Sequence, residues 1–305
     1  MRLQPQRAAY LPPGQHTIMP ASPRSSRHRH AGESMKNLQQ KVAVITGAGS
    51  GIGRALAQEL ACAGSRLALS DINEQGLEQT VALCRSMGAE VRGYTLDVAD
   101  RDAVYAHAAE VLRDFGGVNL VVNNAGVALS AKIEELAWSD FEWLMGINFW
   151  GVTHGTQAFL PHLIASGDGH VVNISSVFGL VGIPKQGAYN AAKFAVRGYT
   201  EALRLEMRMQ NHPVQVSCVH PGGIRTNIAR AARKGESDRD RDLGRDFDKL
   251  AMTTPERAAQ IIVRGILRDR GRILVGPDAG LFELLQRLLG IHYQPVVRRL
   301  MRGKV

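Results

Sequence analysis

Short apolar runs alternate with longer amphipathic segments along most of the chain. The runs hold four to seven residues, mostly Val, Ile, Leu and Ala, and such runs are typical of strands buried on both faces. The longer segments repeat their apolar positions with the period of an α-helix. Strands and helices in this order predict βαβ units with right-handed crossovers. We therefore predict an α/β fold with a single doubly wound domain, in which a seven-stranded, mainly parallel sheet carries helices on both faces.

The pattern also places each expected element. The strands are expected at Val42–Thr46, Arg66–Ser70, Val91–Leu96, Leu120–Asn123, His170–Ser175, Val214–His220 and Arg272–Val275. The helices are expected at Gly51–Ala63, Glu74–Met87, Arg101–Phe115, Ser139–Ala165, Ala188–Asn211 and Pro255–Arg268. Thr254 before Pro255 supports the start of the last helix, because threonine is a good N-cap and proline suits the first helical position.

Three regions depart from this rhythm. Residues 1–36 are rich in Pro, Arg, Ser and His, so we expect a disordered extension, with translation starting at Met35 and a targeting or regulatory arm as the alternative. Residues 37–280 form the expected domain, and its charged segment 227–254 is either a solvated insertion or a mobile lid over a site. Residues 281–305 form a basic amphipathic tail. Packing on the domain, pairing with a second subunit and peripheral contact with a membrane all stay open for it.

The net charge of +9 lies at the two ends of the chain. Residues 1–36 carry six basic residues and one acidic residue, residues 281–305 carry five and one, and residues 37–280 are neutral. Binding to a phosphate backbone needs a basic surface over the fold, which this distribution does not indicate. We expect no nucleic-acid partner.

The three cysteines, Cys62, Cys84 and Cys218, lie inside expected helices or strands and lack the spacing of metal ligands. We expect free buried thiols, no metal ion and a cytoplasmic location. The sequence contains no apolar run of about 18 residues, so no transmembrane helix is predicted.

The first expected strand leads into a glycine-rich turn, residues 46–53 with the sequence TGAGSGIG, which opens the first helix. Glycines there let backbone amides approach a pyrophosphate, and the helix N-terminus adds partial positive charge. Asp71, eighteen residues past Gly53, can accept hydrogen bonds from the ribose hydroxyls of an adenosine. A 2′-phosphate would meet like charge at Asp71, so NAD is predicted over NADP unless Arg54 or Arg66 reaches the ribose. A simple helix cap is the alternative role of Asp71.

Four ordered motifs resemble the short-chain dehydrogenase/reductase family over about residues 38–276. They are the glycine octet, the Asn123-Asn124-Ala125-Gly126 segment, Ser176 thirteen residues before a tyrosine, and the Tyr189-Asn190-Ala191-Ala192-Lys193 segment, with Pro221-Gly222 in addition. The resemblance implies a Rossmann fold and an oxidoreductase acting on the CH–OH group of donors with NAD or NADP as acceptor. It also implies a homodimer or homotetramer that pairs the helices at residues 139–165 and 188–211.

The resemblance further assigns roles to single residues. It implies that Asp97 and Val98 frame the adenine, that Asn124-Ala125-Gly126 steadies the sheet, and that Asn148 distorts its helix and holds a water linked to Lys193. The implied catalytic residues are Asn148, Ser176, Tyr189 and Lys193. The implied cofactor-binding residues are Gly47, Ser50, Gly51, Ile52, Gly53, Asp71, Asp97, Val98, Asn124, Ala125, Gly126, Tyr189, Lys193, Pro221, Gly222, Ile224 and Thr226, of which Ile224 and Thr226 are expected at the nicotinamide carboxamide.

The residue types suit proton transfer. An ordinary tyrosine, with a pKa of about 10, is a poor base near neutrality. Lys193 is one helical turn from Tyr189, so its ammonium can favour the phenolate, and Ser176 can hydrogen-bond the substrate oxygen. Apolar residues beside the motifs predict an apolar alcohol or ketone as substrate; they are Val127, Leu129, Val177, Phe178, Leu180, Val181 and Ile183. A non-catalytic NAD-binding sensor or scaffold is the alternative function.

Overall fold

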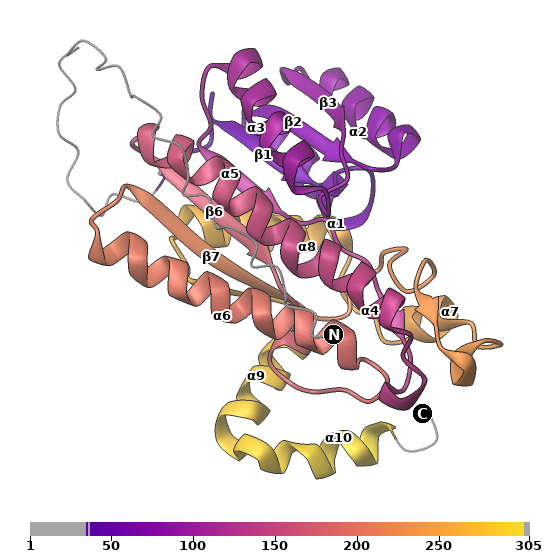
Figure 1. Cartoon of the computed structure of the whole chain (residues 1–305). Helices are drawn as coiled ribbons and strands as arrows, with labels where there is room; N and C mark the ends of the chain where they lie inside the picture. The colour runs from indigo at the N-terminus through magenta and orange to yellow at the C-terminus, as the bar shows by residue number, and fades with distance from the viewer. Residues whose placement is uncertain (1–34, 36, 302–305) are drawn as a thin grey trace, which may run out of the picture. The chain divides into compact units, whose positions relative to one another are not determined.

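Seven parallel strands form the central sheet in the order β3-β2-β1-β4-β6-β7-β9 (Figure 1). The structure is a computed structural model that describes Met35 and residues 37–301, so the expectations for the remaining residues of the two ends lie outside the described residues. Every neighbouring pair of strands is parallel, which confirms the predicted doubly wound α/β fold. The strands are β1 (Val42–Thr46), β2 (Arg66–Asp71), β3 (Val91–Thr95), β4 (Leu120–Asn123), β6 (Gly169–Ile174), β7 (Val214–Pro221) and β9 (Arg272–Val275).

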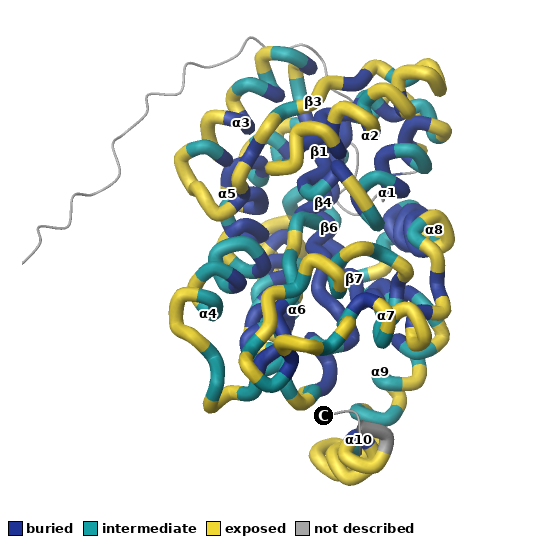
Figure 2. The backbone as a smooth tube through the Cα atoms, turned by 90° about the vertical axis from the view of Figure 1, so that its right-hand side faces the viewer, coloured by how far each residue is buried: buried dark blue, intermediate teal, exposed yellow. Residues whose placement is uncertain are grey.

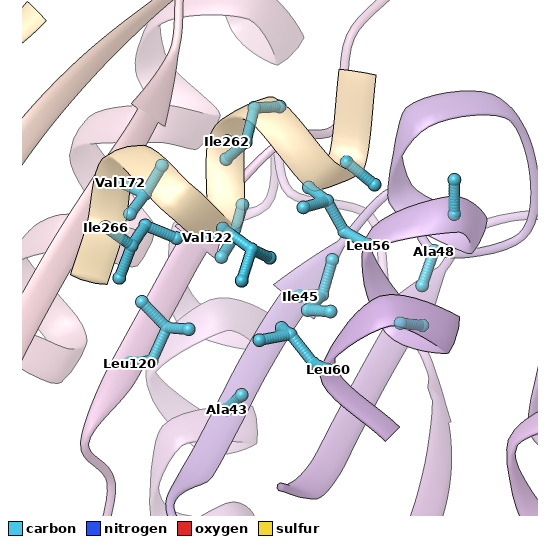
Figure 3. Close-up of a cluster of buried hydrophobic side chains, with 14 of the residues drawn as sticks. Ala43, Ile45, Ala48, Leu56, Leu60, Leu120, Val122, Val172, Ile262 and Ile266 are labelled. Carbon is cyan, nitrogen blue, oxygen red and sulfur yellow. The ribbon is translucent and has the colours of Figure 1, made fainter. Parts of the chain in front are cut away.

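Helices cover both faces of this sheet. One face packs against α1 (Gly51–Cys62), α2 (Glu74–Ser86) and α8 (Pro255–Leu267), and the other against α3 (Arg101–Phe115), α5 (Gly151–Ala165) and α6 (Gly187–Met209). Figure 3 shows the first core, where Leu56 and Leu60 of α1 and Ile262 and Ile266 of α8 meet side chains of β1, β4 and β6.

The strands alternate their side chains between the two cores. Ala43 and Ile45 of β1 join the core under α1 and α8, whereas Val42 and Val44 join the core under α3 and α5. This is the two-residue period of a strand whose faces are both covered. It explains why the strands have near-continuous apolar sequences.

The expected helix at residues 139–165 is continuous but irregular. It consists of α4 (Trp138–Met145), a π-helical turn at Gly146–Trp150, and α5. The π turn contains Asn148, so the local distortion implied by the family resemblance is present in the structure. Such turns insert one extra residue and are frequent at functional sites.

Residues 227–254 contain secondary structure that the sequence did not indicate. A short strand β8 (Arg233–Lys234) pairs in parallel with β5 (Leu129–Ser130), and α7 (Leu243–Asp248) follows. Asp238 inside this segment is completely buried, so the segment is not a fully solvated insertion, and its role as a mobile lid stays a prediction.

The C-terminal part begins earlier than expected. Helix α9 (Pro277–Leu289) starts four residues before the predicted tail at Leu281, so the predicted boundary between residues 280 and 281 falls inside a helix. Helix α10 (Gln294–Met301) follows. No helix in the described ranges is long and apolar enough to span a bilayer.

One cysteine also differs from the prediction. Cys84 and Cys218 are free and buried as expected, but Cys62, the last residue of α1, is exposed. The helical period places it on the solvent side, one position past the buried Ala61.

Candidate active site

The glycine-rich turn between β1 and α1 forms a cradle that side chains would fill. Gly47 and Gly51 have φ angles of 66° and 51°, which only glycine adopts freely. A Cβ at Gly53 would lie 2.0 Å from the Gly47 carbonyl oxygen, and one at Gly49 would lie 2.9 Å from Oδ2 of Asp71. Ser50 is the N-cap residue of α1, and its hydroxyl makes no cap hydrogen bond. The exposed amides at this helix start therefore fit a pyrophosphate.

Asn124 ties the end of β4 to this turn. Its Nδ2 donates to the carbonyl oxygens of Thr46, at 2.9 Å, and Gly47, at 3.1 Å. The hydroxyl of Thr46 accepts hydrogen bonds from the amides of Asn124 and Ala125, both at 3.0 Å. The segment Asn124-Ala125-Gly126 thus holds two adjacent strand ends together.

Asp71 lies beside the glycine turn, at the end of β2. Its Oδ2 accepts from the Gly49 amide at 2.8 Å, and its Oδ1 accepts from the Asn73 amide at 2.8 Å. The side chain that caps α2 is that of Asn73, so Asp71 is not the helix cap. Its carboxylate therefore lies against the glycine turn.

Neither arginine that would alter the cofactor prediction is directed to Asp71. Arg66 forms an ion pair with Glu90 at 2.7 Å and stacks over the Phe115 ring, at the amino end of β2. Arg54 donates to Thr80 at 2.9 Å and to the Gly49 carbonyl oxygen at 2.5 Å, which uses its guanidinium between α1 and α2.

Asn148 in the π turn makes a paired contact with the loop after β4. Its Oδ1 accepts from the Val127 amide at 2.8 Å, and its Nδ2 donates to the Val127 carbonyl oxygen at 2.8 Å. The side chain is completely buried. A Cβ at Gly126 would lie 3.2 Å from Oδ1 of Asn148 and 3.6 Å from Nζ of Lys193, so this glycine separates the two polar groups.

Ser176 and Tyr189 are brought together at the end of β6. Burial raises the pKa of the Tyr189 phenol to about 12, and a hydrogen bond with the Ser176 side chain acts in the opposite direction. The phenol ring packs edge-on against Phe178, with 6.1 Å between ring centres. The serine hydroxyl also accepts from the Phe178 amide at 3.1 Å.

Lys193 lies one helical turn further along α6 and faces the same region. Its Nζ is 5.6 Å from the centre of the Tyr189 ring and donates to the Ile174 carbonyl oxygen at 3.0 Å. Burial lowers the pKa of Lys193 to about 8. The ammonium therefore lies over the face of the Tyr189 ring and is held there by the backbone at the end of β6.

The remaining expected cofactor residues differ in exposure and in what they contact. Asp97 is exposed and Val98 is buried just past β3. A Cβ at Gly51 would lie 3.0 Å from Cγ2 of Thr226, so Thr226 faces the glycine turn. Ile224 is only 3% exposed and belongs to the core, which leaves its backbone for any ligand. A cavity of about 170 Å³ opens here; it is lined by Gly51, Arg54, Ala55, Gln58, Arg225, Thr226, Asn227, Pro255 and Glu256.

Two residues that support this site were not singled out from the sequence. His220, fully buried at the end of β7, has its Nδ1 2.9 Å from the Ser176 carbonyl oxygen, so this nitrogen is the donor. Asp278, in the first turn of α9, accepts from the Gly223 amide at 2.6 Å, directly after Pro221-Gly222. No short motif marks such contacts, because the partners are 44 and 55 positions apart.

A buried ion pair fixes the segment 227–254 next to α6. Asp238 is 0% exposed and accepts from Lys185 Nζ at 2.7 Å and from Ser130 Oγ at 2.6 Å. Arg241 donates to the same carboxylate at 3.2 Å. Lys185 lies four residues before Tyr189, so this pair connects the segment to the start of the helix that carries the tyrosine.

Comparison with known proteins places the chain in a family. Residues 41–237 match the family model described as short chain dehydrogenase. The protein described as "Putative oxidoreductase SadH" of Mycobacterium tuberculosis is 52% identical over 264 residues, which cover 86% of this chain and 96% of that protein. Human estradiol 17-beta-dehydrogenase 11 is 31% identical, over 87% of this chain and 84% of that protein.

Solved structures agree with this placement. A short chain dehydrogenase/reductase from Burkholderia phymatum, crystallised in complex with NAD, is 36% identical, with a TM-score of 0.76 over 83% of this chain and 95% of that chain. The chain therefore belongs to the short-chain dehydrogenase/reductase family. It is an oxidoreductase that acts on CH–OH groups.

Proposed function

We propose that the protein interconverts a secondary alcohol and a ketone or aldehyde of an apolar small molecule, with NAD as cofactor and Tyr189 as general acid/base. The observation that carries this proposal is the meeting of Tyr189, Ser176 and Lys193 at the carboxyl edge of the sheet, next to the glycine cradle. Ligands of open α/β sheets bind at this edge.

The residues present fit a nicotinamide dinucleotide. The cradle of Gly47, Gly49 and Gly53 excludes side chains, and the start of α1 offers amides to a pyrophosphate. Asp71, Asp97 and Val98 would hold the adenosine end. Pro221, Gly222, Ile224 and Thr226 would hold the nicotinamide end. When bound, the cofactor supplies the hydride acceptor or donor of the reaction.

The chain's own residues would handle the proton. Ser176 would donate a hydrogen bond to the substrate oxygen and keep it beside the phenol. Tyr189 would take the alcohol proton in oxidation and return it in reduction. Because burial raises the pKa of the phenol to about 12, deprotonation needs positive charge near its oxygen. Lys193 supplies part of this charge, and Asn148 shapes the loop that faces it.

NAD is the proposed cofactor because the carboxylate of Asp71 accepts from the Gly49 amide and lies against the glycine turn, beside the position proposed for the ribose. A 2′-phosphate there would meet like charge at close range. Arg66 is paired with Glu90. Arg54 lies at the turn and uses its guanidinium on Thr80 and on the Gly49 carbonyl oxygen. The complex of the Burkholderia relative with NAD supports the same choice.

The apolar residues predicted to form the substrate pocket differ in their exposure. Leu129, Val177, Leu180 and Val181 are at most 4% exposed and pack inside the protein. Val127, Phe178 and Ile183 are partly exposed. Phe178 contacts the Tyr189 ring and would form the apolar wall next to the reacting carbon.

The test is turnover of apolar secondary alcohols with NAD, followed by NADH absorbance, in the unaltered protein and in Tyr189→Phe. We expect the variant to lose nearly all turnover and to keep its NADH affinity, because the ring packing is retained and only the hydroxyl is lost. Unchanged turnover would contradict the role of Tyr189. NADH binding without turnover of any alcohol in the unaltered protein would favour the alternative of a sensor or scaffold.

We also propose that the protein is a cytoplasmic homodimer or homotetramer. The helices predicted to form the interface expose large apolar side chains, such as Trp150 and Leu205, which are 52% and 61% exposed. Sedimentation velocity tests this assembly, and a monomer would contradict it. The free thiols of Cys62, Cys84 and Cys218 suit a reducing compartment.

A further inference from the structure

Helix α9 presents leucines on its solvent side. Leu281, Leu284 and Leu288 are 56%, 53% and 71% exposed, and their spacing places them on one helix face. Leu285, on the same face, is partly buried, and on the opposite side Ala279 is buried and Glu283 is partly buried. A surface helix normally exposes its polar residues to water and buries its apolar ones. Helix α9 instead exposes a row of leucines.

Positive charge borders the leucine face. Arg287 on the flank of α9 and Arg298 and Arg299 on α10 are exposed. Glu283, the one acidic residue in 281–305, is engaged by Arg272 at 2.8 Å. Ile291, between the two helices, is 69% exposed and extends the apolar surface. We call α9 and α10 together the C-terminal hairpin (residues 277–301). Its outer surface is therefore both apolar and basic.

The hairpin is attached to the domain by its inner side. The Tyr293 hydroxyl accepts from the Gly182 amide at 2.8 Å, and Val297 of α10 is only 6% exposed. Asp278 at the start of α9 accepts from the Gly223 amide. Figure 2 shows α10 projecting from the body of the molecule with an exposed outer surface. These contacts hold the leucine face outward.

We propose that the outer surface of α9 and α10 docks on an anionic lipid bilayer, with α9 lying in the plane of the interface. Leu281, Leu284 and Leu288 would enter the boundary between headgroups and acyl chains, over a helix length of about 10 Å. The arginines would face the lipid phosphates. The exposed positive charge beside the leucines favours an anionic bilayer as the occupant, and a second copy of this chain is the alternative that sedimentation velocity tests. The proposal does not depend on the proposed function.

The test is flotation of the full-length protein with vesicles. We expect it to float with vesicles of equal parts phosphatidylcholine and phosphatidylglycerol, and less with phosphatidylcholine alone. The double variant Leu284→Gln, Leu288→Gln should lower the partition coefficient roughly tenfold or more, because it removes two of the inserted side chains. The double variant Arg298→Gln, Arg299→Gln should lower it roughly tenfold on the anionic vesicles only, and should weaken its dependence on salt.

The matched control is Leu83→Gln with Met87→Gln at the end of α2, where two apolar side chains are 41% and 40% exposed beside the single exposed Arg85. This variant should float like the unaltered protein, and all variants should keep their thermal midpoint. The proposal is overturned if the unaltered protein stays in the bottom fraction of the gradient with anionic vesicles, or if the leucine variant floats as well as the unaltered protein. It is also overturned if sedimentation velocity shows that the leucine variant dissociates an oligomer without changing flotation.

Discussion

The buried ion pair of Asp238 and Lys185 predicts a large loss of stability when one partner is removed. The two side chains are 0% and 8% exposed, and Nζ and Oδ1 are 2.7 Å apart. Truncating one partner of a buried pair costs about 3–5 kcal/mol, since the other charge stays desolvated. Arg241 is 34% exposed and contacts the same carboxylate, so it also loses this contact when Asp238 is removed. We expect Asp238→Ala to lower the free energy of unfolding by about 3 kcal/mol.

Urea unfolding at neutral pH, followed by far-UV circular dichroism, measures this loss. Lys185→Ala should give a loss of similar size, and the double variant should lose about 2 kcal/mol less than the sum of the two. The control is Arg239→Ala, which breaks an ion pair with Glu236 in the same segment, with side chains 71% and 68% exposed. It should cost at most about 0.5 kcal/mol.

Limited trypsin digestion gives a second measurement of the same pair. Without Asp238, Ser130 of β5 loses the acceptor of its hydroxyl next to the short β5–β8 pairing. Cleavage within the segment 227–254 should therefore become faster. The reasoning is refuted if Asp238→Ala costs no more than Arg239→Ala and cleavage is unchanged. The segment would then be held by backbone pairing and packing alone.

Three further predictions concern the cofactor, the pH and the serine. Asp71→Ala should lower the ratio of kcat/KM with NAD to that with NADP by roughly tenfold, since charge-assisted hydrogen bonds are worth about 1.5–3 kcal/mol; an unchanged ratio contradicts the role of Asp71. Burial lowers the pKa of His107 and His220 to about 4 and the pKa of His170 to about 3. Between about pH 4 and 6.5 the unfolded state therefore binds more protons than the folded state, so the free energy of unfolding falls as the pH falls through that range. Urea unfolding against pH should show this slope, and His107→Phe should reduce it, whereas a flat profile contradicts it. His220→Leu should lower kcat by roughly tenfold through loss of the 2.9 Å contact with Ser176, with NADH affinity retained; a loss of NADH affinity with unchanged kcat would place His220 in cofactor binding instead.

The sequence predicts the sheet well because its strands are buried on both faces. Continuous apolar runs such as Val42–Thr46 and Leu120–Asn123 can be read directly, and both match the structure at their ends. The glycine turn, Asp71, Ser176, Tyr189 and Lys193 were predicted from ordered motifs, and the structure brings them to one edge. Their roles as catalytic and cofactor-binding residues stay predictions.

The residues that the sequence did not reveal act through distant contacts. Asp238 belongs to a segment with charges of both signs and little periodicity, which is typical of solvated surface. Its burial depends on Lys185 and Ser130, which are 53 and 108 positions away. The start of α9 at Pro277 was missed because the apolar period begins only at Leu281. The first turn of the helix is held instead by Asp278, which accepts from the Gly223 amide.

The polar groups that hold the site connect neighbouring strand ends to one another. Thr46 at the end of β1 accepts from two amides after β4, and His220 at the end of β7 donates to the carbonyl oxygen of Ser176 after β6. Where parallel strands stop, their backbone groups lose ladder partners and need side chains to satisfy them. A substitution at one strand end therefore leaves a buried group unsatisfied on the next. We infer that effects at Thr46 and Asn124 are not additive, whereas apolar substitutions at the opposite edge of the sheet mainly change packing.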